Sequence, residues 1–412
     1  MVDDASSIGA RARMIRRRRR LSLEVAAGLA GLSKGYLSLL EHGQRGFNRR
    51  GLIEDLAAAL GCSVADLTGQ PYLLMDQETA AATPAISEIS VALHSATLDD
   101  VPDVPTRPIA QLVKAAAQAN LHRDNARYAV AVQGLGAVMT ELHVWAVTGT
   151  GSDRQAALTA LTEACQVAYH LARLTGRAEL AMTAAERGHE AARRSERPDL
   201  TGLMAMNRSG GLMKLGARWR ATSICADALG EVSALPGPAP DDTRTAEAQG
   251  MLLLTAGLWA AHDGRPEYTA AYLTEARDLA AHTGERNHMR FHFGPTNVAA
   301  WELGLAVECG TGPDAAERFV AAPIDFSVFA SKEREADVTF DLARAWAQAD
   351  GARDGEALRA LDTADRLAPL RVRNDPIART WCSPWTAGPG GGYGNSAPCV
   401  TASASVVRVH GV

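Results

Sequence analysis

One spacing recurs five times between residues 176 and 364 and constrains the fold of this 412-residue chain more than any other feature. In each set a small residue is followed, five, nine and twelve positions later, by residues that can pack a pair of helices. The sets begin at Gly176, Gly216, Gly264, Gly310 and Ala352, so the starts lie 40, 48, 46 and 42 positions apart. A period of this length indicates stacked helix pairs that bury their apolar faces against one another. Aromatic residues make up only 5% of the chain, and its abundant Ala, Leu and Arg favour helices, so we expect an all-α fold.

The order of residues in each set resembles a degenerate tetratricopeptide (TPR) repeat with lengthened helices. The resemblance implies a TPR-like α-solenoid over residues 109–378, whose concave binding face is lined by the first helix of each pair. An unrelated helical bundle is the alternative, because alanine matches are frequent in an alanine-rich chain. The candidate ligand-binding residues on the first helices are Gln166, Tyr169, Asn207, Arg208, Gln249, His292, Asn297 and Trp301.

A second pattern lies in the N-terminal 70 residues. The stretch LSLEVAAGLAGLSKGYLSLLEHG, residues 21–43, has helix-turn-helix spacing. Ala27 is small enough for two helices to cross closely, Gly31 supplies the turn, and Leu37 and Leu40 are core residues on the second helix. We expect five helices in this region: residues 8–19, a second helix after Ser22, a recognition helix from Lys34 to Glu41 after Ser33, residues 49–60, and a short helix after Ser63. The three serines stand where N-caps are needed.

The motifs LSxEVA, AGLS, YLSxLExG and LAxALGCSxxDL lie between residues 21 and 67, inside a region that extends from residue 8 to residue 69. With these motifs the region resembles the Cro/lambda-repressor-like (XRE) family of transcription regulators. The resemblance implies a five-helix DNA-binding domain over residues 1–70 that acts on double-stranded DNA as a homodimer. Its charge agrees, since residues 1–70 hold 11 Lys+Arg and 7 Asp+Glu, whereas the rest of the chain carries a net charge of −9. A helix-turn-helix that serves only for protein contact is the alternative.

The DNA-binding candidates fall into two groups. With Leu37 and Leu40 directed inward, the residues expected to face a major groove are Ser33, Lys34, Gly35, Ser38, Leu39 and His42. Lys34 can donate to guanine and Leu39 can pack on a thymine methyl group, but Gly35 has no side chain to read a base. The expected phosphate contacts, for which a solvated basic face is the alternative, are Arg16, Arg17 and Arg18 with the adjoining Arg19 and Arg20, and Arg45, Arg49 and Arg50.

Residues 71–108 contain five prolines and read as a linker with one short helix near residues 86–93. The resulting order of domains resembles the RRNPP-type peptide-sensing regulators, in which Asn residues of the concave face hold the backbone of the signal. In the segment FHFGPTNVAAW, residues 291–301, Asn297 is the strongest such candidate, because an amide can pair with a peptide N–H and C=O together. Helix capping is the alternative for Asn297, and a core position is the alternative for Trp301. The resemblance implies a small-molecule or peptide effector; a repeat domain that binds a partner protein is the other interpretation.

Catalytic motifs are absent from the sequence. It contains no HExxH, P-loop or Rossmann fingerprint, and we expect neither an enzyme nor a cofactor. His288 and His292 have i, i+4 spacing but no third ligand, so no metal is expected. Six scattered cysteines are typical of reduced thiols in a cytoplasmic protein, and no apolar run reaches the ~20 residues that a membrane span needs.

The composition changes abruptly after residue 378. Residues 379–412 are rich in Gly, Ser and Ala, where a stacked repeat array needs a closing amphipathic helix. Back-translation with G/C-rich codons, read one base earlier, gives an amphipathic helical sequence in place of residues 394–406. We therefore hypothesise a frameshift in this atypical tail, which we expect to be disordered and poorly packed; a naturally disordered tail is the alternative.

Overall fold

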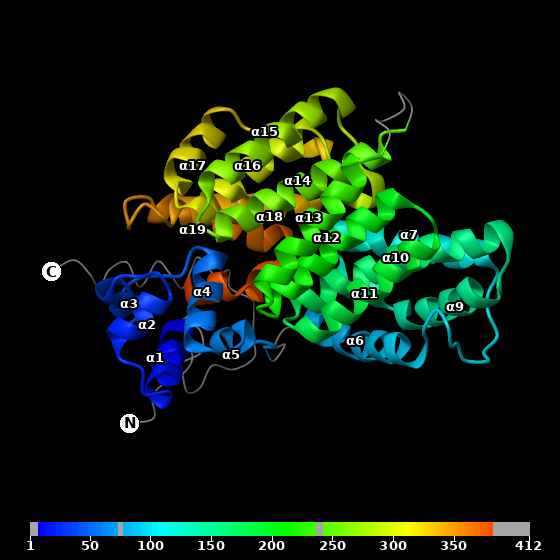
Figure 1. The fold of residues 1–412 in the computed structure, drawn as a ribbon, viewed down its shortest axis with the longest axis horizontal. Coiled ribbons are helices and arrows are strands. Elements are labelled where there is room, and N and C mark those ends of the chain that lie inside the picture. The colour runs from blue at the N-terminus through cyan, green and yellow to red at the C-terminus, as the bar shows by residue number, and fades with distance from the viewer. Residues whose placement is uncertain (1–6, 73–76, 236–241, 382–412) are drawn as a thin grey trace.

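Five short helices, most of them capped by serine, build the N-terminal domain of the computed structural model, which describes residues 7–72, 77–235 and 242–381 (Figure 1). The hydroxyls of Ser7, Ser22, Ser33 and Ser63 accept hydrogen bonds from backbone N–H groups that begin helices. These caps satisfy donors that a helix leaves unpaired, and the predicted caps Ser22, Ser33 and Ser63 are confirmed. The helices are α1 (Ile8–Arg18), α2 (Leu23–Leu29), α3 (Lys34–Glu41), α4 (Arg50–Leu60) and α5 (Val64–Thr68).

The second part of the chain begins with a layer of helices that precedes the repeats. Its helices are α6 (Gln77–Ser95), α7 (Ile109–Asp124), α8 (Tyr128–Val132) and α9 (Leu135–Thr148). The short helix predicted near residues 86–93 is thus longer than expected. Its apolar residues at helical spacing, Ile86, Ile89 and Leu93, are buried in the same core as α9 and α10, so α6 is part of the helical domain.

Five helix pairs follow, with the turns where the spacing placed them. Gly176, Gly216, Gly264 and Gly310 each lie just after a first helix with positive φ, a conformation that glycine adopts without strain. The pairs are α10 (Gly151–Leu174) with α11 (Ala178–Arg194), α12 (Pro198–Lys214) with α13 (Arg218–Ser233), α14 (Arg244–His262) with α15 (Pro266–Thr283), α16 (Pro295–Cys309) with α17 (Gly312–Ala321), and α18 (Lys332–Trp346) with α19 (Asp354–Leu367). The shorter elements are η1 (His288–Arg290), η2 (Phe326–Val328), α20 (Pro369–Arg373) and α21 (Pro376–Trp381). All described residues are helical or in loops, so the all-α prediction is confirmed.

The array of helices closes back on its own beginning. Asp124, the last residue of α7, accepts hydrogen bonds from the Ser331 hydroxyl at 2.7 Å and from Arg290 at 3.1 Å, and its Oδ1 lies 2.9 Å from His292 Nε2. The neighbouring Arg123 pairs with Glu333 of α18. These contacts join the first helices of the domain to the last pair, so the inner face surrounds a cavity.

The N-terminal domain packs against the last helices of the chain through a shared apolar core. Leu52 and Leu56 of α4 lie in one buried cluster with Phe340, Leu361 and Ile377. Figure 1 shows the N-terminal domain at one end of the molecule, with α4 toward the helical domain and α3 on the far side. Helices from the beginning and the end of the described chain therefore share one core.

Residues 379–381 of the atypical tail belong to α21. The Trp381 ring lies 6.1 Å from that of Phe340, so the expectation of poor packing does not hold for Trp381. Residues 382–412, including Cys382 and Cys399, lie outside the described residues.

One described helical stretch, Tyr128–Thr148, is long and apolar enough for a membrane span, with a mean hydropathy of 1.3. Half of it is buried inside the protein, and Gln133 and Gly134 break it into α8 and α9. Packing in the core accounts for its apolar character.

The closest crossing in the N-terminal domain yields a prediction. A Cβ on Gly9 of α1 would lie 2.0 Å from the backbone oxygen of Leu40 on α3, so Gly9→Ala must push the two helices apart. Overpacking of this kind costs about 1–3 kcal/mol. We expect amides of α1 and α3 in the full chain to exchange hydrogen roughly 5- to 150-fold faster than in the parent.

Gly28→Ala is the matched control, because no atom lies within 4 Å of a Cβ at this exposed position of α2. It should leave exchange unchanged or slow it slightly, since alanine favours helix over glycine. Equal exchange in the Gly9→Ala variant and the parent would show that the α1–α3 crossing is looser than described.

Candidate DNA interface and ligand cavity

The recognition helix α3 presents its predicted groove-facing residues on one side. Ser33, Lys34, Gly35 and His42 are exposed, and Ser38 and Leu39 are half-buried. Lys34 is held only by an exposed contact of 3.7 Å to Glu24, and His42 Nδ1 lies 2.7 Å from the carbonyl oxygen of Ser38. The residues directed inward, Leu37 and Leu40, are fully buried. The helix can therefore meet another molecule without refolding.

The arginines predicted to meet phosphates have different surroundings. Arg17 and Arg18 are exposed at the end of α1, whereas Arg16 makes a two-pronged ion pair with Glu41 at 2.6 and 2.7 Å and ties α1 to α3. Arg45 pairs with Asp350 of the helical domain, and Arg49 is half-buried just before α4.

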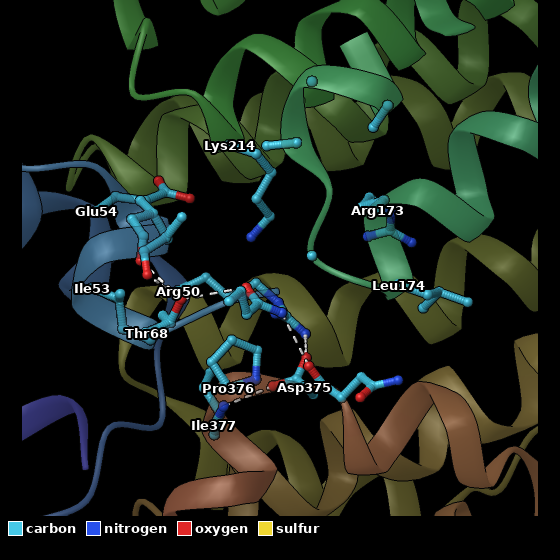
Figure 2. A pocket seen from close by; sticks show the side chains of 18 of the residues that line it. Arg50, Ile53, Glu54, Thr68, Arg173, Leu174, Lys214, Asp375, Pro376 and Ile377 are labelled. Carbon is cyan, nitrogen blue, oxygen red and sulfur yellow. Dashed lines mark hydrogen bonds and ion pairs between the residues drawn. The ribbon is translucent and has the colours of Figure 1, made fainter. Parts of the chain in front are cut away.

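Arg50 differs most from its predicted role as a phosphate contact. It is directed into the helical domain, where it pairs with Asp375 at 2.8 Å, and Figure 2 shows this contact at the floor of a pocket. Arg16, Arg45 and Arg50 are thus engaged within the protein.

The comparison with known families bears on this end of the chain. Residues 7–68 match a family model described as a helix-turn-helix domain. Residues 7–68 form a helix-turn-helix DNA-binding domain. Searches among curated proteins and among solved structures found no match to the chain.

A buried carboxylate joins the helix-turn-helix domain to the repeats. Glu308, at the end of α16, accepts a hydrogen bond of 2.9 Å from the backbone N–H of Arg50, the first residue of α4. A negative charge at a helix N-terminus is favourable, because the free N–H groups there carry partial positive charge. Glu308 also pairs with Arg344, whose Nε donates to the carbonyl oxygen of Asn48 at 3.2 Å. These contacts hold α4 against the inner end of the repeats.

His262 lies between two carboxylates of this network. Its Nδ1 is 3.0 Å from Glu54 Oε2 of α4, and its Nε2 is 3.5 Å from Glu308 Oε2. Burial alone would lower the pKa of His262, but the charges of Glu54 and Glu308 outweigh that effect and raise it. For Glu308, the charges of Arg344 and His262 outweigh burial and lower the pKa to about 2.

A cavity of about 280 Å³ lies inside the closed array and reaches α4. Its wall carries many charged side chains, and each carboxylate among them has a basic partner. The pairs are Glu54 with His262, Asp124 with Arg290 and His292, Glu308 and Asp341 with Arg344, Glu333 with Arg123, and Asp337 with Arg371. Three lining cations, Arg173, Lys214 and Arg334, make no ion pair with any described carboxylate. The cavity is therefore richer in positive than in negative charge.

Five of the predicted ligand-binding residues line this cavity: Tyr169, Asn207, His292, Asn297 and Trp301. The remaining three do not. Gln166 is buried outside the lining and donates to the Met289 carbonyl oxygen at 2.9 Å. Arg208 pairs with Glu186. Gln249 is half-buried and outside the lining.

Asn297 is buried, and both ends of its amide have partners. It donates to the Phe291 carbonyl oxygen at 3.2 Å and accepts from Arg334 Nε at 2.8 Å. Gly294, and not Asn297, stands at the N-cap of α16, so capping is not its role. The Arg334 guanidinium in turn lies 5.8 Å from the centre of the Trp301 ring, a cation–π contact at the cavity wall.

The loop that precedes α16 is strained where it borders the cavity. Met289, Arg290 and His292 all have positive φ, between 50° and 60°, which costs non-glycine residues free energy. Contacts from Gln166 and Asp124 hold the loop in this conformation. Strain of this kind is concentrated at functional sites, and it marks this wall of the cavity.

The sequence interpretation missed most of the charged residues of the wall. Lys214, His262 and Glu308 each stand two positions before the turn glycine of a repeat, in the last turn of a first helix. The register of the repeats alone would have placed these three charges at one end of the array.

The histidines considered for metal binding are separate in the structure. His288 lies 3.1 Å from Asp199, whereas His292 lies beside Asp124. Within the described ranges no cluster of three potential metal ligands occurs, and Cys62, Cys165, Cys225 and Cys309 are free thiols.

The raised pKa of His262 predicts a pH-dependent contact between the two domains. Protonated His262 stabilises the docked state fully below its ordinary pKa of 6.5, and the contribution is lost as the pH rises through the raised pKa. Each unit of the rise corresponds to about 1.4 kcal/mol. Protection of α4 amides in hydrogen exchange, corrected for intrinsic rates, should therefore fall as the pH rises above 6.5 and through the raised pKa of His262.

His262→Gln should flatten this pH profile while keeping every other group of the network. His282→Gln is the control, because His282 is exposed on α15 and contacts only the Asp278 carbonyl oxygen. A profile that is equally steep in His262→Gln would show that another group is responsible.

Proposed function

We propose that this protein is a ligand-responsive transcription regulator of the cytoplasm. Its helix-turn-helix domain binds a specific DNA site, and its TPR-like domain binds a small molecule or peptide in the inner cavity. One observation carries the proposal: Arg50 and Glu54 of α4 belong to the cavity wall. A ligand in that cavity touches the DNA-binding domain directly and favours one position of it over another.

The proposed regulator acts as a homodimer formed mainly through the helical domain. A single short recognition helix contacts too few base pairs for high specificity, so helix-turn-helix domains commonly bind two half-sites about one helical turn apart. The helix-turn-helix domain already uses α4 and its flanks against the repeats, which leaves the outer surface of the helical domain for dimer contact.

The DNA-binding proposal predicts different effects for two kinds of variant. Lys34→Ala should reduce discrimination between the preferred site and other sequences by about 1–3 kcal/mol, because Lys34 is assigned to a base. Arg18→Ala should weaken binding to all sequences alike and reduce the salt dependence, because a phosphate contact carries no sequence information. Sites selected from genomic fragments by the purified chain, followed by mobility shifts over a range of salt, provide the measurement.

Arg220→Gln is the control for these variants, since Arg220 is exposed on α13 and its side chain donates to Ser223 Oγ of the same helix. It should leave specificity and salt dependence as in the parent. Footprints should show two-fold symmetric half-sites. If the full chain ignores DNA even at low salt, the proposal fails.

The second candidate is a DNA-tethered adaptor whose repeats bind a partner protein. The exposed Trp219 on α13 favours this reading, since large exposed aromatic side chains are frequent in protein interfaces. Native mass spectrometry of the purified chain separates the two functions. We expect a retained metabolite or peptide of constant stoichiometry, which Trp219→Ala leaves in place; a chain with no retained mass and no response to added metabolite extract would favour the adaptor.

A further inference from the structure

Two cations meet where the inner cavity joins a smaller pocket under α4. This pocket, of about 80 Å³, shares Arg173 of α10 and Lys214 of α12 with the cavity, together with Arg50, Glu54, Tyr169 and Arg371. Figure 2 shows Arg173 and Lys214 reaching into the pocket from two different helices, with no dashed line to either side chain. Arg50, below them, is already paired with Asp375.

Arg173 and Lys214 lack partners in a place where a partner is needed. The Nε atom of Arg173 is buried and makes no hydrogen bond, and neither side chain pairs with a described carboxylate. A buried polar group without a hydrogen bond costs free energy, and a charge costs more. The array thus holds two positive charges whose natural complement is missing from the part of the chain that the structure describes.

Neighbouring arginines add to the positive charge around Arg173 and Lys214. Burial and the positive charges of Arg50 and Arg173 lower the pKa of Lys214 to about 8. Glu54 and Asp375 act in the opposite direction, but each is already paired, with His262 and with Arg50. Burial and Arg173 likewise lower the pKa of Arg371 to about 10. Cations that repel one another in a partly enclosed space form a site prepared for an anion.

We propose that Arg173 and Lys214 bind the phosphate group of a small-molecule ligand. This assignment rests on the proposed sensing function and names the chemical class of the signal. A phosphate ester carries close to two negative charges at neutral pH, enough for both cations, whereas a carboxylate carries one. The planar Arg173 guanidinium can donate to two phosphate oxygens at once, and Lys214 adds a point charge from α12.

The site also explains how a signal reaches the DNA-binding domain. Arg50 borders the same pocket and begins α4. A phosphate bound to Arg173 and Lys214 attracts Arg50 and competes with Asp375 for it. The ligand therefore acts on the ion pair that fixes α4.

Thermal unfolding of the full chain, desalted into chloride buffer, tests the site with inorganic phosphate as the probe. Phosphate at about ten times its half-saturating concentration should raise the unfolding temperature by about 2 °C over chloride of equal ionic strength. The rise should shrink between pH 7 and pH 9, as Lys214 loses its proton. No rise beyond chloride would overturn the proposal, and an equal rise with acetate would overturn the assignment to phosphate.

Variants locate the effect. Arg173→Gln and Lys214→Gln, alone and together, should abolish the phosphate-dependent rise while leaving the unfolding temperature in chloride equal or higher, because each removes repulsion. Arg220→Gln, a change of the same kind on the exposed surface, should keep the rise. A rise that persists in the double variant would place phosphate elsewhere and overturn the assignment.

Mobility shifts with DNA in chloride separate this proposal from the function on which it rests. The double variant should bind DNA as the parent does. If the parent binds DNA but phosphate has no effect, only the phosphate site fails. If the parent binds no DNA, the regulatory function fails whatever phosphate does.

Discussion

The carboxylate of Glu308 is the contact on which the relation between the two domains depends. It accepts a hydrogen bond from the first backbone N–H of α4, pairs with Arg344 and lies beside His262. One side chain thus links a helix of the DNA-binding domain to α14, α16 and α18 of the repeats. A charge buried this deeply is stable only while its partners stay in place. The two domains are therefore held together by the apolar core of α4 and by a few buried polar contacts. A change in any of these polar contacts alters how α4 is held against the repeats.

The inner face of the array is polar for the same reason. First helices of successive pairs end at the same side of the molecule, so their last turns bring Lys214, His262 and Glu308 together beside α4. Cations are favourable at the C-terminal ends of helices, where carbonyl groups are left unpaired, and this favours Lys214 and His262. A cavity built this way suits a charged ligand better than an apolar one, and a molecule bound in it would lie against α4 of the DNA-binding domain.

The sequence predicted local features well and distant pairings poorly. The bounds of the recognition helix matched because a serine cap and the apolar spacing of Leu37 and Leu40 are encoded within ten residues. The ion pair of Arg50 could not be predicted, because its partner Asp375 lies 325 positions away. Nothing in the local sequence distinguishes Arg50 from an arginine that contacts phosphate. Part of the cavity lining was predictable from the sequence, since helix register places Tyr169 and Trp301 on the inner face. The unpaired state of Arg173 was not, because it depends on which carboxylates the folded chain brings near it.

The shared core of α4 and α21 bears on the order in which the protein is made. The helix-turn-helix domain leaves the ribosome first, but Ile377 and Trp381, which pack with its cluster, are among the last described residues to be synthesised. At a translation rate of 5–20 residues per second, the interval between α4 and α21 is roughly 15 to 60 s. During that time the apolar surface of the helix-turn-helix domain that packs against α21 is exposed. A chain that stalls before α21 therefore carries a helix-turn-helix domain with an exposed apolar surface, which favours aggregation.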